Sequence, residues 1–318
     1  MGFVSISSFR AGDEVRGVFA CVRKDRLKTR TGSPYLALEL RDKTGSVQAR
    51  AFRDADVLAG LFERGDLVSV VGRVERFRDQ LTVEISDIRR AEGRFAGTGE
   101  DATLADRSEA QTVMIQEFLP VAYRDMEELD GFLEHLSREV YDPGYRALLE
   151  SLLDDAEIRQ ALRRTPCTRN GHHAYLGGLL EHTVAVATLA REICDLHRRL
   201  DSDLLITAAI VHDLGRIREF TYGAEIGLSD EGRLLGHLVL GQQLLSERFA
   251  LLEQQGTALD QSHRLALLHC VLSHHGASSA PGGRFASPEA LALYRVNALD
   301  AGVKGVLEHG FQGGEEGR

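Results

Sequence analysis

The hydrophobic pattern of the sequence changes its period once, and this change predicts two domains of different kinds. From Glu14 to Ile88, apolar and β-branched residues alternate with polar ones, which is typical of half-buried strands. From Val113 onward, apolar residues recur at helical spacing. A small, polar, glycine-bearing stretch at residues 91–112 predicts a linker. We therefore expect a multidomain chain with a β-barrel in residues 1–90 and an all-α domain in residues 113–318.

The N-terminal alternation divides into five candidate strands with a short helix after the third. The helix is Ala55–Leu61, and the strands are Glu14–Val22, Tyr35–Arg41, Val47–Phe52, Leu67–Val74 and Leu81–Ile88. This is the order of the OB-fold barrel. The run GSPYLALELRDKTGSVQARAF followed by GDLVSVVGRVERFRDQLTVEI also resembles the nucleic-acid-binding OB domains of synthetases and exonucleases.

OB barrels bind single strands by stacking bases on exposed aromatic side chains within a basic groove. The aromatic candidates are Tyr35, Phe52 and Phe77, although core packing is the favoured interpretation of Phe52. The basic candidates are Arg23, Lys24, Arg26, Lys28 and Arg30 in the first connecting loop, with Arg50, Arg76 and Arg78 further along. A solvated surface is the alternative for the loop, and phosphate contact is favoured because that loop borders the binding face in this fold.

The charge of the chain is unevenly distributed. Residues 10–90 contain 17 Lys and Arg against 13 Asp and Glu, whereas the whole chain has a net charge of -10. The remainder must therefore carry a net charge of -14. This balance excludes a generic nucleic-acid coat and favours a polyanion bound at the N-terminal part, such as single-stranded RNA or DNA.

The lengths of the apolar runs and the spacing of the cysteines indicate where in the cell the protein is located. No apolar run approaches the roughly 20 residues that span a bilayer, and the N-terminus has no signal-peptide pattern, so we expect a cytoplasmic protein without a membrane partner. The cysteines include no CxxC pair, which favours buried free thiols over disulfides or a thiolate zinc site: Cys21, Cys167, Cys194 and Cys270.

Most of the twelve histidines fall between His172 and His275, on predicted helices. One helix places His182 on its apolar face together with Val186, Leu189, Ile193 and Leu196. The next runs from about Asp203, carries His212 and Asp213 in its last turn, and ends at Gly215 as a C-terminal cap.

Three further helices follow in the pattern. The first places His237 with Leu240, Gly241 and Leu244, and the second begins at Ser262 and ends at His274-His275 before Gly276. The third begins with Ser287 as N-cap and Pro288, and carries Tyr294, Asn297 and Asp300 at intervals of three. A histidine beside an aspartate in an apolar segment is costly unless a partner satisfies both. A divalent cation would do so, and the sequence therefore predicts a metal site.

The segments HHAYLGGLLEHT, HDLGR, GHLVLG, SHHG and ALDA together resemble the HD superfamily of metal-dependent phosphohydrolases. They are closest to its branch of YhaM-type 3′-to-5′ exoribonucleases, which also join an OB domain to an HD domain, so the resemblance covers nearly the whole chain. It implies two divalent metal ions, Mn²⁺ foremost, with Co²⁺, Fe²⁺, Mg²⁺ and Zn²⁺ as alternatives.

The resemblance also implies site residues. The first metal would be held by His182, His212 and Asp213, and Asp213 would bridge to a second metal completed by His237 and by His274 or His275. The catalytic set would be Asp213, Arg216, His172 and His173.

Two positions depart from the family pattern. Arg216 replaces a lysine near the scissile phosphate, and Asn297 occupies the position of the late aspartate ligand, with Asp300 three residues on. Three outcomes stay open: a working site with altered metal affinity, a site that uses Asp300, and a lapsed enzyme.

The resemblance implies 3′-to-5′ hydrolysis of single-stranded RNA, with the OB domain guiding the strand to the HD site. Whether single-stranded DNA is also a substrate stays open. A phosphohydrolase of nucleotides or cyclic dinucleotides is one alternative. A catalytically lapsed RNA-binding protein is another, and homo-oligomerisation stays open.

Overall fold

The computed structural model describes residues 5–29, 31–42, 44–77, 80–91, 119–222, 225–257 and 259–310. These residues form two compact units. The first comprises the described residues up to Pro120 together with Tyr222–Gly227, and the second comprises the rest. All but the first residue of the predicted linker at 91–112 lies outside the described residues.

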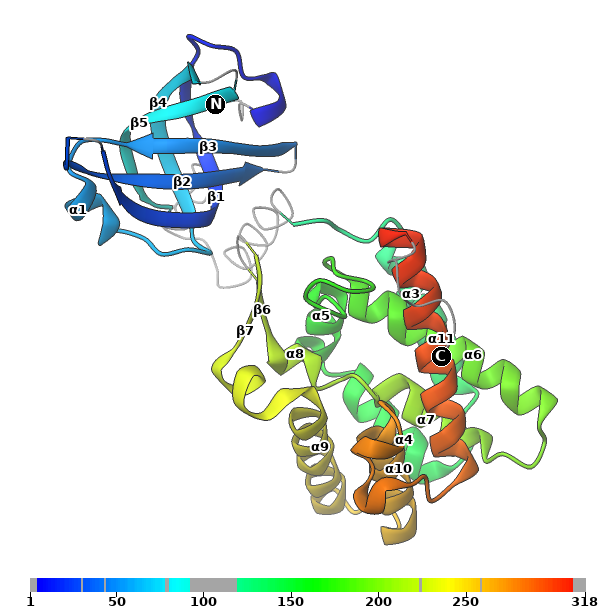
Figure 1. Ribbon diagram of the computed structural model, residues 1–318. Helices are drawn as coiled ribbons and strands as arrows, with labels where there is room; N and C mark the ends of the chain where they lie inside the picture. Colours follow the sequence, from blue (N-terminus) through cyan, green and yellow to red (C-terminus); the bar gives the residue numbers. More distant parts are fainter. Residues whose placement is uncertain are drawn as a thin grey trace, which may run out of the picture. The chain divides into compact units, whose positions relative to one another are not determined.

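The first unit is a closed five-stranded barrel with the strand order β1-β2-β3-β5-β4 (Figure 1). Strands β3 and β5 pair in parallel, and the other neighbours are antiparallel. The short helix α1 follows the third strand, so the predicted OB-fold is confirmed. The elements are η1 (Ile6–Ser8), β1 (Glu14–Lys28), β2 (Pro34–Asp42), β3 (Gly45–Ala51), α1 (Ala55–Ala59), β4 (Leu67–Phe77) and β5 (Gln80–Arg90).

Strand β1 is longer than the sequence predicts. Its first half pairs with β4, and its second half continues along β2 through an irregularity between Cys21 and Arg23. The prediction that the basic residues lie in a loop is therefore wrong, because they lie on β1: Arg23, Lys24, Arg26 and Lys28. The second half of β1 is largely exposed on both faces, so it lacks the alternation that marks a half-buried strand. Arg30 and Arg78 lie outside the described residues.

The second unit is helical. The short strands β6 and β7 pair with each other, and their residues are divided between the two units. No helix among the described residues is both long and apolar enough to cross a membrane. The elements are α3 (Met126–Arg138), α4 (Pro143–Leu153), α5 (Ala156–Arg164), α6 (Gly178–Leu196), α7 (Ser202–Val211), α8 (Arg216–Glu219), β6 (Phe220–Tyr222), β7 (Ile226–Leu228), α9 (Asp230–Gln254), α10 (Gln261–Ser273), η2 (Ala277–Ser279), η3 (Pro281–Gly283) and α11 (Pro288–His309).

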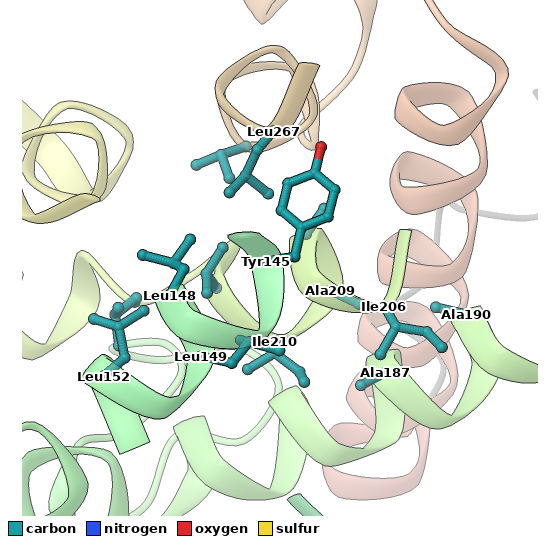
Figure 2. Close-up of a cluster of buried hydrophobic side chains, with 14 of the residues drawn as sticks. Tyr145, Leu148, Leu149, Leu152, Ala187, Ala190, Ile206, Ala209, Ile210 and Leu267 are labelled. Carbon is teal, nitrogen blue, oxygen red and sulfur yellow. The ribbon is translucent and has the colours of Figure 1, made fainter. Parts of the chain in front are cut away.

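Helix α7 is the central element of the helical unit. Every residue from Leu204 to Val211 is buried, and the helix contacts α3, α4, α6, α10 and α11. Figure 2 shows Ile206 of α7 beside Ala187 of α6, with leucines of α4 on the other side. A helix that is apolar all round is stable only when it is enclosed in this way. The chain beyond Val211 therefore emerges inside the protein, and the next residues are His212 and Asp213.

The sequence predicts Gly215 as the C-terminal cap of α7, and this prediction is wrong. Helix α7 already ends at Val211, and Gly215 has φ -60°. Its role is close packing against α9. A Cβ atom at this position would lie 2.0 Å from the backbone oxygen of His237 and 2.4 Å from the nitrogen of Gly241. Only glycine lets the two backbones approach so closely. This contact brings His237 to the end of α7.

Three details of the helix predictions are wrong and one is confirmed. Leu196 at the end of α6 is 78% exposed, because the helix projects beyond its neighbours there. The residue before α10 is Asp260, so Ser262 lies inside that helix, and α10 ends at Ser273. Ser287 does cap α11, accepting a hydrogen bond from the Ala290 backbone, with proline at the first helical position.

Candidate metal centre

The helical unit brings histidines from α6 and α9 and from the ends of α7 and α10 around Asp213. One carboxylate oxygen, Oδ2, lies 3.8 Å from His182 Nε2 and 3.7 Å from His212 Nε2. The other, Oδ1, lies 3.5 Å from His237 Nε2 and 3.4 Å from His274 Nε2. The two oxygens of one carboxylate thus face two different pairs of histidines. Such a carboxylate can bridge two cations.

The hydrogen bonds of the histidines determine which ring nitrogen is available. The Nδ1 atom of His212 donates to the Ala209 carbonyl at 2.8 Å, and that of His274 donates to the Val271 carbonyl at 2.6 Å. The Nδ1 atom of His182 donates to Asp300 Oδ2 at 2.6 Å. In the neutral form of each ring, Nε2 is therefore the nitrogen that can bind a metal ion, and such partners for Nδ1 are usual for metal-binding histidines.

Two observations test whether these residues fit a metal ion. The Nε2 atoms of His182 and His212 lie only 3.3 Å apart, and both carry lone pairs. In addition, Asp213 Oδ1 and His274 Nε2 are buried without a hydrogen-bond partner. Unpaired buried polar atoms are costly, and one cation at each of the two positions would satisfy all four atoms. Imidazole and carboxylate are ligands of zinc, manganese, iron and cobalt, so the residues fit a divalent metal.

Charges next to Asp213 keep it ready to bind a cation. Burial opposes its ionisation, but the Arg216 guanidinium, with the neighbouring histidines, holds the pKa of Asp213 well below its usual range. Burial lowers the pKa of His212 well below its usual value, which keeps that ring neutral. A metal site needs an ionised carboxylate and neutral imidazoles, and Asp213 and His212 meet this requirement.

Arg216 lies inside the centre, as predicted, between two carboxylates. Its Nε atom lies 2.7 Å from Asp213 Oδ2, and its Nη1 atom donates to Glu219 Oε2 at 3.2 Å. Glu219 also accepts hydrogen bonds from the backbone and the Nδ1 atom of His237, at 3.0 and 3.2 Å. Glu219 is not among the site residues predicted from the sequence, since its spacing carries no metal-ligand signal. It orients both Arg216 and His237.

His173 belongs to a buried hydrogen-bond network behind His182. Asp300 Oδ2 lies 3.1 Å from His173 Nε2, and His173 Nδ1 lies 2.9 Å from the Tyr175 hydroxyl. That hydroxyl donates to Glu181, which also accepts from Lys304. His173 thus links Asp300 to Tyr175, and its role is to support Asp300.

The two late candidates, Asn297 and Asp300, take different positions on α11. Asp300 is bound to His182 at hydrogen-bond distance, which leaves no room for an ion between those atoms. Burial opposes its ionisation, but hydrogen bonds from His173 and His182 hold the pKa of Asp300 below its usual value. Asn297 is buried, and its amide donates to the backbone oxygen of His274 at 3.3 Å. Both residues therefore position histidines.

Cys167 and His172 lie beside the first pair of histidines. The predicted burial of the cysteines is confirmed, and all four are free thiols. Cys167 is nevertheless not an ordinary core residue. Its sulfur lies 3.7 Å from Asp213 Oδ2 and 3.6 Å from His172 Nε2. Burial raises the pKa of Cys167 and lowers that of His172 to about 4. The available signal was its position five residues before His172.

On the barrel, the predicted aromatic residues lie on the outer face of β2, β3 and the end of β4. Tyr35 and Phe52 stack at 5.3 Å, and the Arg50 guanidinium lies 4.3 Å from the centre of the Phe77 ring. The interpretation of Phe52 as a core residue is wrong. Ala51 points inward on β3, so the next side chain points outward and is 44% exposed. OB domains use this face for oligonucleotides.

The basic candidates of the barrel differ in their availability. Lys24 Nζ donates to the backbone oxygens of Ala59 and Phe62, at 2.7 and 2.5 Å, which secures the segment at the end of α1. Two others form exposed ion pairs, Arg23 with Asp25 and Arg26 with Asp56. Lys28 and Arg76 lie exposed near the ends of β1 and β4.

Family models match both units. The model of the HD domain matches residues 179–302, and the model of an OB-fold nucleic acid binding domain matches residues 15–91. A third, described as a putative helicase, matches residues 135–203. The chain thus joins an OB-fold nucleic acid binding domain to an HD domain.

Over most of its length the chain is homologous to proteins named 3'-5' exoribonuclease YhaM. It is 29% identical to that of Bacillus subtilis over 273 residues, 85% of this chain and 79% of the relative. It is 27% identical to that of Shouchella clausii over 307 residues, 94% of this chain and 86% of the relative. Among solved structures, the second OB-fold domain of replication protein A from Methanococcus maripaludis matches 30% of this chain and 99% of that domain, with 19% identity and a TM-score of 0.25.

Proposed function

We propose that this chain is a metal-dependent 3′-to-5′ exonuclease of single-stranded RNA, with two metal positions that share Asp213. The observation that carries the proposal is the division of its carboxylate, with Oδ2 facing His182 and His212 and Oδ1 facing His237 and His274. The OB domain and the homology to exoribonucleases support a nucleic-acid strand as the substrate. Manganese is the metal that we propose.

When bound, the metal ions would supply an activated water and would neutralise charge on the phosphodiester. The residues of the chain prepare this chemistry. Asp300 holds the ring of His182, and Glu219 holds that of His237, so both present Nε2. Asn297 holds the backbone of His274, and the departure from the family's aspartate leaves the other donors intact. The proposal therefore takes the first of the three open outcomes, a working site with altered metal affinity.

Arg216 supplies a permanent positive charge in the centre. Its guanidinium is buried between Asp213 and Glu219, whose charges, acting against the burial, raise its pKa further. A charge held in place without solvent reorganisation can stabilise the negative charge that develops on a phosphodiester during hydrolysis. This is the function that we propose for Arg216.

The barrel would bind the strand through stacking. Tyr35, Phe52 and Phe77 offer aromatic surface on one face, with Arg50 beside them. Stacking on such residues tolerates any base, which suits an enzyme that degrades strands of varied sequence.

The test is digestion of end-labelled single-stranded RNA in the presence of Mn²⁺ by the wild type and by a His212→Ala, Asp213→Ala variant. We expect stepwise shortening from the 3′ end by the wild type alone. Equal activity of both proteins would refute the metal-centre proposal. Turnover of nucleotides or cyclic dinucleotides without any digestion of RNA would favour the small-molecule alternative. RNA affinity without turnover would favour a lapsed enzyme.

A further inference from the structure

Cys167 and His172 form a group of metal-binding atoms that the proposed hydrolysis does not use. Cys167 is fully buried, and its sulfur lies 3.6 Å from His172 Nε2 and 3.7 Å from Asp213 Oδ2. Possible ligand atoms of Cys167, His172 and His182 all lie within 4.8 Å of one another. Sulfur is thus placed among nitrogen and oxygen donors at one position.

The spacing of these atoms matches tetrahedral zinc. With a Zn–S distance of about 2.3 Å and a Zn–N distance of about 2.0–2.1 Å, the sulfur and nitrogen ligands of a tetrahedral site lie about 3.5 Å apart. The sulfur of Cys167 meets this distance toward His172. The three residues of the group therefore supply one sulfur and two nitrogens.

We propose that Cys167, His172 and His182 form an inhibitory zinc subsite beside the first metal position, with Asp213 next to its sulfur. A thiolate favours zinc over the harder ions manganese and magnesium. On binding, the thiol would release its proton to solvent as the sulfur–zinc bond forms.

The subsite competes with the first metal position because the two share donors. His182 belongs to the group of Cys167 and His172 and also to the group of His212 and Asp213. Its Nδ1 atom is held by Asp300, which leaves Nε2 as the donor for a metal ion. The single lone pair of an imidazole nitrogen binds one metal ion at a time. Zinc held by Cys167 therefore withdraws His182 from His212. The regulatory part of this inference rests on the proposed function, whereas the binding part stands without it.

The binding part is tested by titrating the metal-free full-length protein with Co²⁺, which occupies tetrahedral zinc sites and shows a near-ultraviolet charge-transfer band when a thiolate binds it. We expect this band in the wild type and in Cys194→Ala, a control in which another buried thiol is removed from α6. We expect it to be absent in Cys167→Ala and strongly reduced in His172→Ala. An unchanged band in Cys167→Ala, or cobalt binding by the wild type without a band, would overturn the subsite.

The regulatory part is tested by adding Zn²⁺ to the manganese-loaded protein during RNA digestion. We expect inhibition that excess Mn²⁺ relieves, and a loss of zinc sensitivity of about tenfold or more in Cys167→Ala, by analogy with the effect of removing a neighbour of a metal ligand. Equal zinc sensitivity of both proteins would overturn the regulation. A cobalt band in a protein that digests no RNA would refute the proposed function but not the subsite. Circular dichroism checks that each variant is folded, and His172→Ala carries the test if Cys167→Ala is not.

Discussion

Asp300 on α11 accepts a hydrogen bond from the Nδ1 atom of His182 on α6 over 2.6 Å, so the last helix of the chain orients a histidine of the metal centre. The same oxygen lies 3.1 Å from the ring of His173. Asp300 therefore acts through His182, as a positioning residue.

Replacing Asp300 should weaken the metal centre without emptying it. In Asp300→Asn the side chain can still accept through its oxygen but loses its charge, and in Asp300→Ala the ring of His182 is released. We expect metal affinity to fall by about 10- to 100-fold in Asp300→Ala, the usual effect of removing a partner of a metal ligand, and less in Asp300→Asn. Manganese titration followed by calorimetry measures this. A loss in Asp300→Ala as complete as in Asp213→Asn would instead indicate a direct ligand.

Two replacements of Arg216 should distinguish the contribution of its positive charge to stability from that of its two-pronged contact with the carboxylates. Arg216→Lys keeps the charge but not the fork between Asp213 and Glu219, and we expect the free energy of unfolding to fall by about 1.5–3 kcal/mol, the value of a hydrogen bond to a charged group. Arg216→Gln leaves the two carboxylates without their cation, and we expect a loss of about 3–5 kcal/mol. Urea unfolding of the metal-free proteins measures both. Equal stability of both variants and the wild type would contradict this role of Arg216 between the two carboxylates.

Replacing the stacked pair on the barrel should weaken RNA binding and spare the metal centre. We expect Tyr35→Ala with Phe52→Ala to reduce the affinity for a single-stranded oligonucleotide by about 1–3 kcal/mol for each base that loses its stacking partner. Manganese binding should not change. The matched control is Tyr123→Ala, which removes a fully exposed aromatic ring from the helical unit. Fluorescence anisotropy measures the affinity, and an equal effect of both changes would contradict the predicted face.

A methyl group at Gly215 should disturb the helical unit. Gly215→Ala places a Cβ atom 2.0 Å from the His237 backbone oxygen, and both neighbours are backbone atoms that cannot rotate away. We expect a loss of about 1–3 kcal/mol, as for an overpacked core, together with weaker metal binding because His237 is displaced. Gly302→Ala on α11 is the control, since a Cβ there meets no atom within 4 Å and should stabilise the helix by up to about 1 kcal/mol. Thermal unfolding distinguishes the two changes.

The period of the hydrophobic pattern was sufficient to predict both domains, because strands and helices that bury one face repeat apolar residues at different intervals. The histidines that converge on Asp213 were also predictable, since a polar pair at the end of an apolar helix needs a partner. Phe52 was misassigned because its burial depends on strand register, which a hydrophobic residue at a strand end does not reveal. Glu219 and Cys167 were missed because their contacts with His237 and Asp213 join residues far apart in the sequence.

The central claim is that the Asp213 carboxylate binds metal through both of its oxygens. The most direct measurement is the number of Mn²⁺ ions bound per chain by the wild type and by Asp213→Asn, which keeps the shape of the side chain and removes its charge. We predict two ions in the wild type and loss of binding at both positions in the variant. Equal manganese binding by the two proteins would contradict the account.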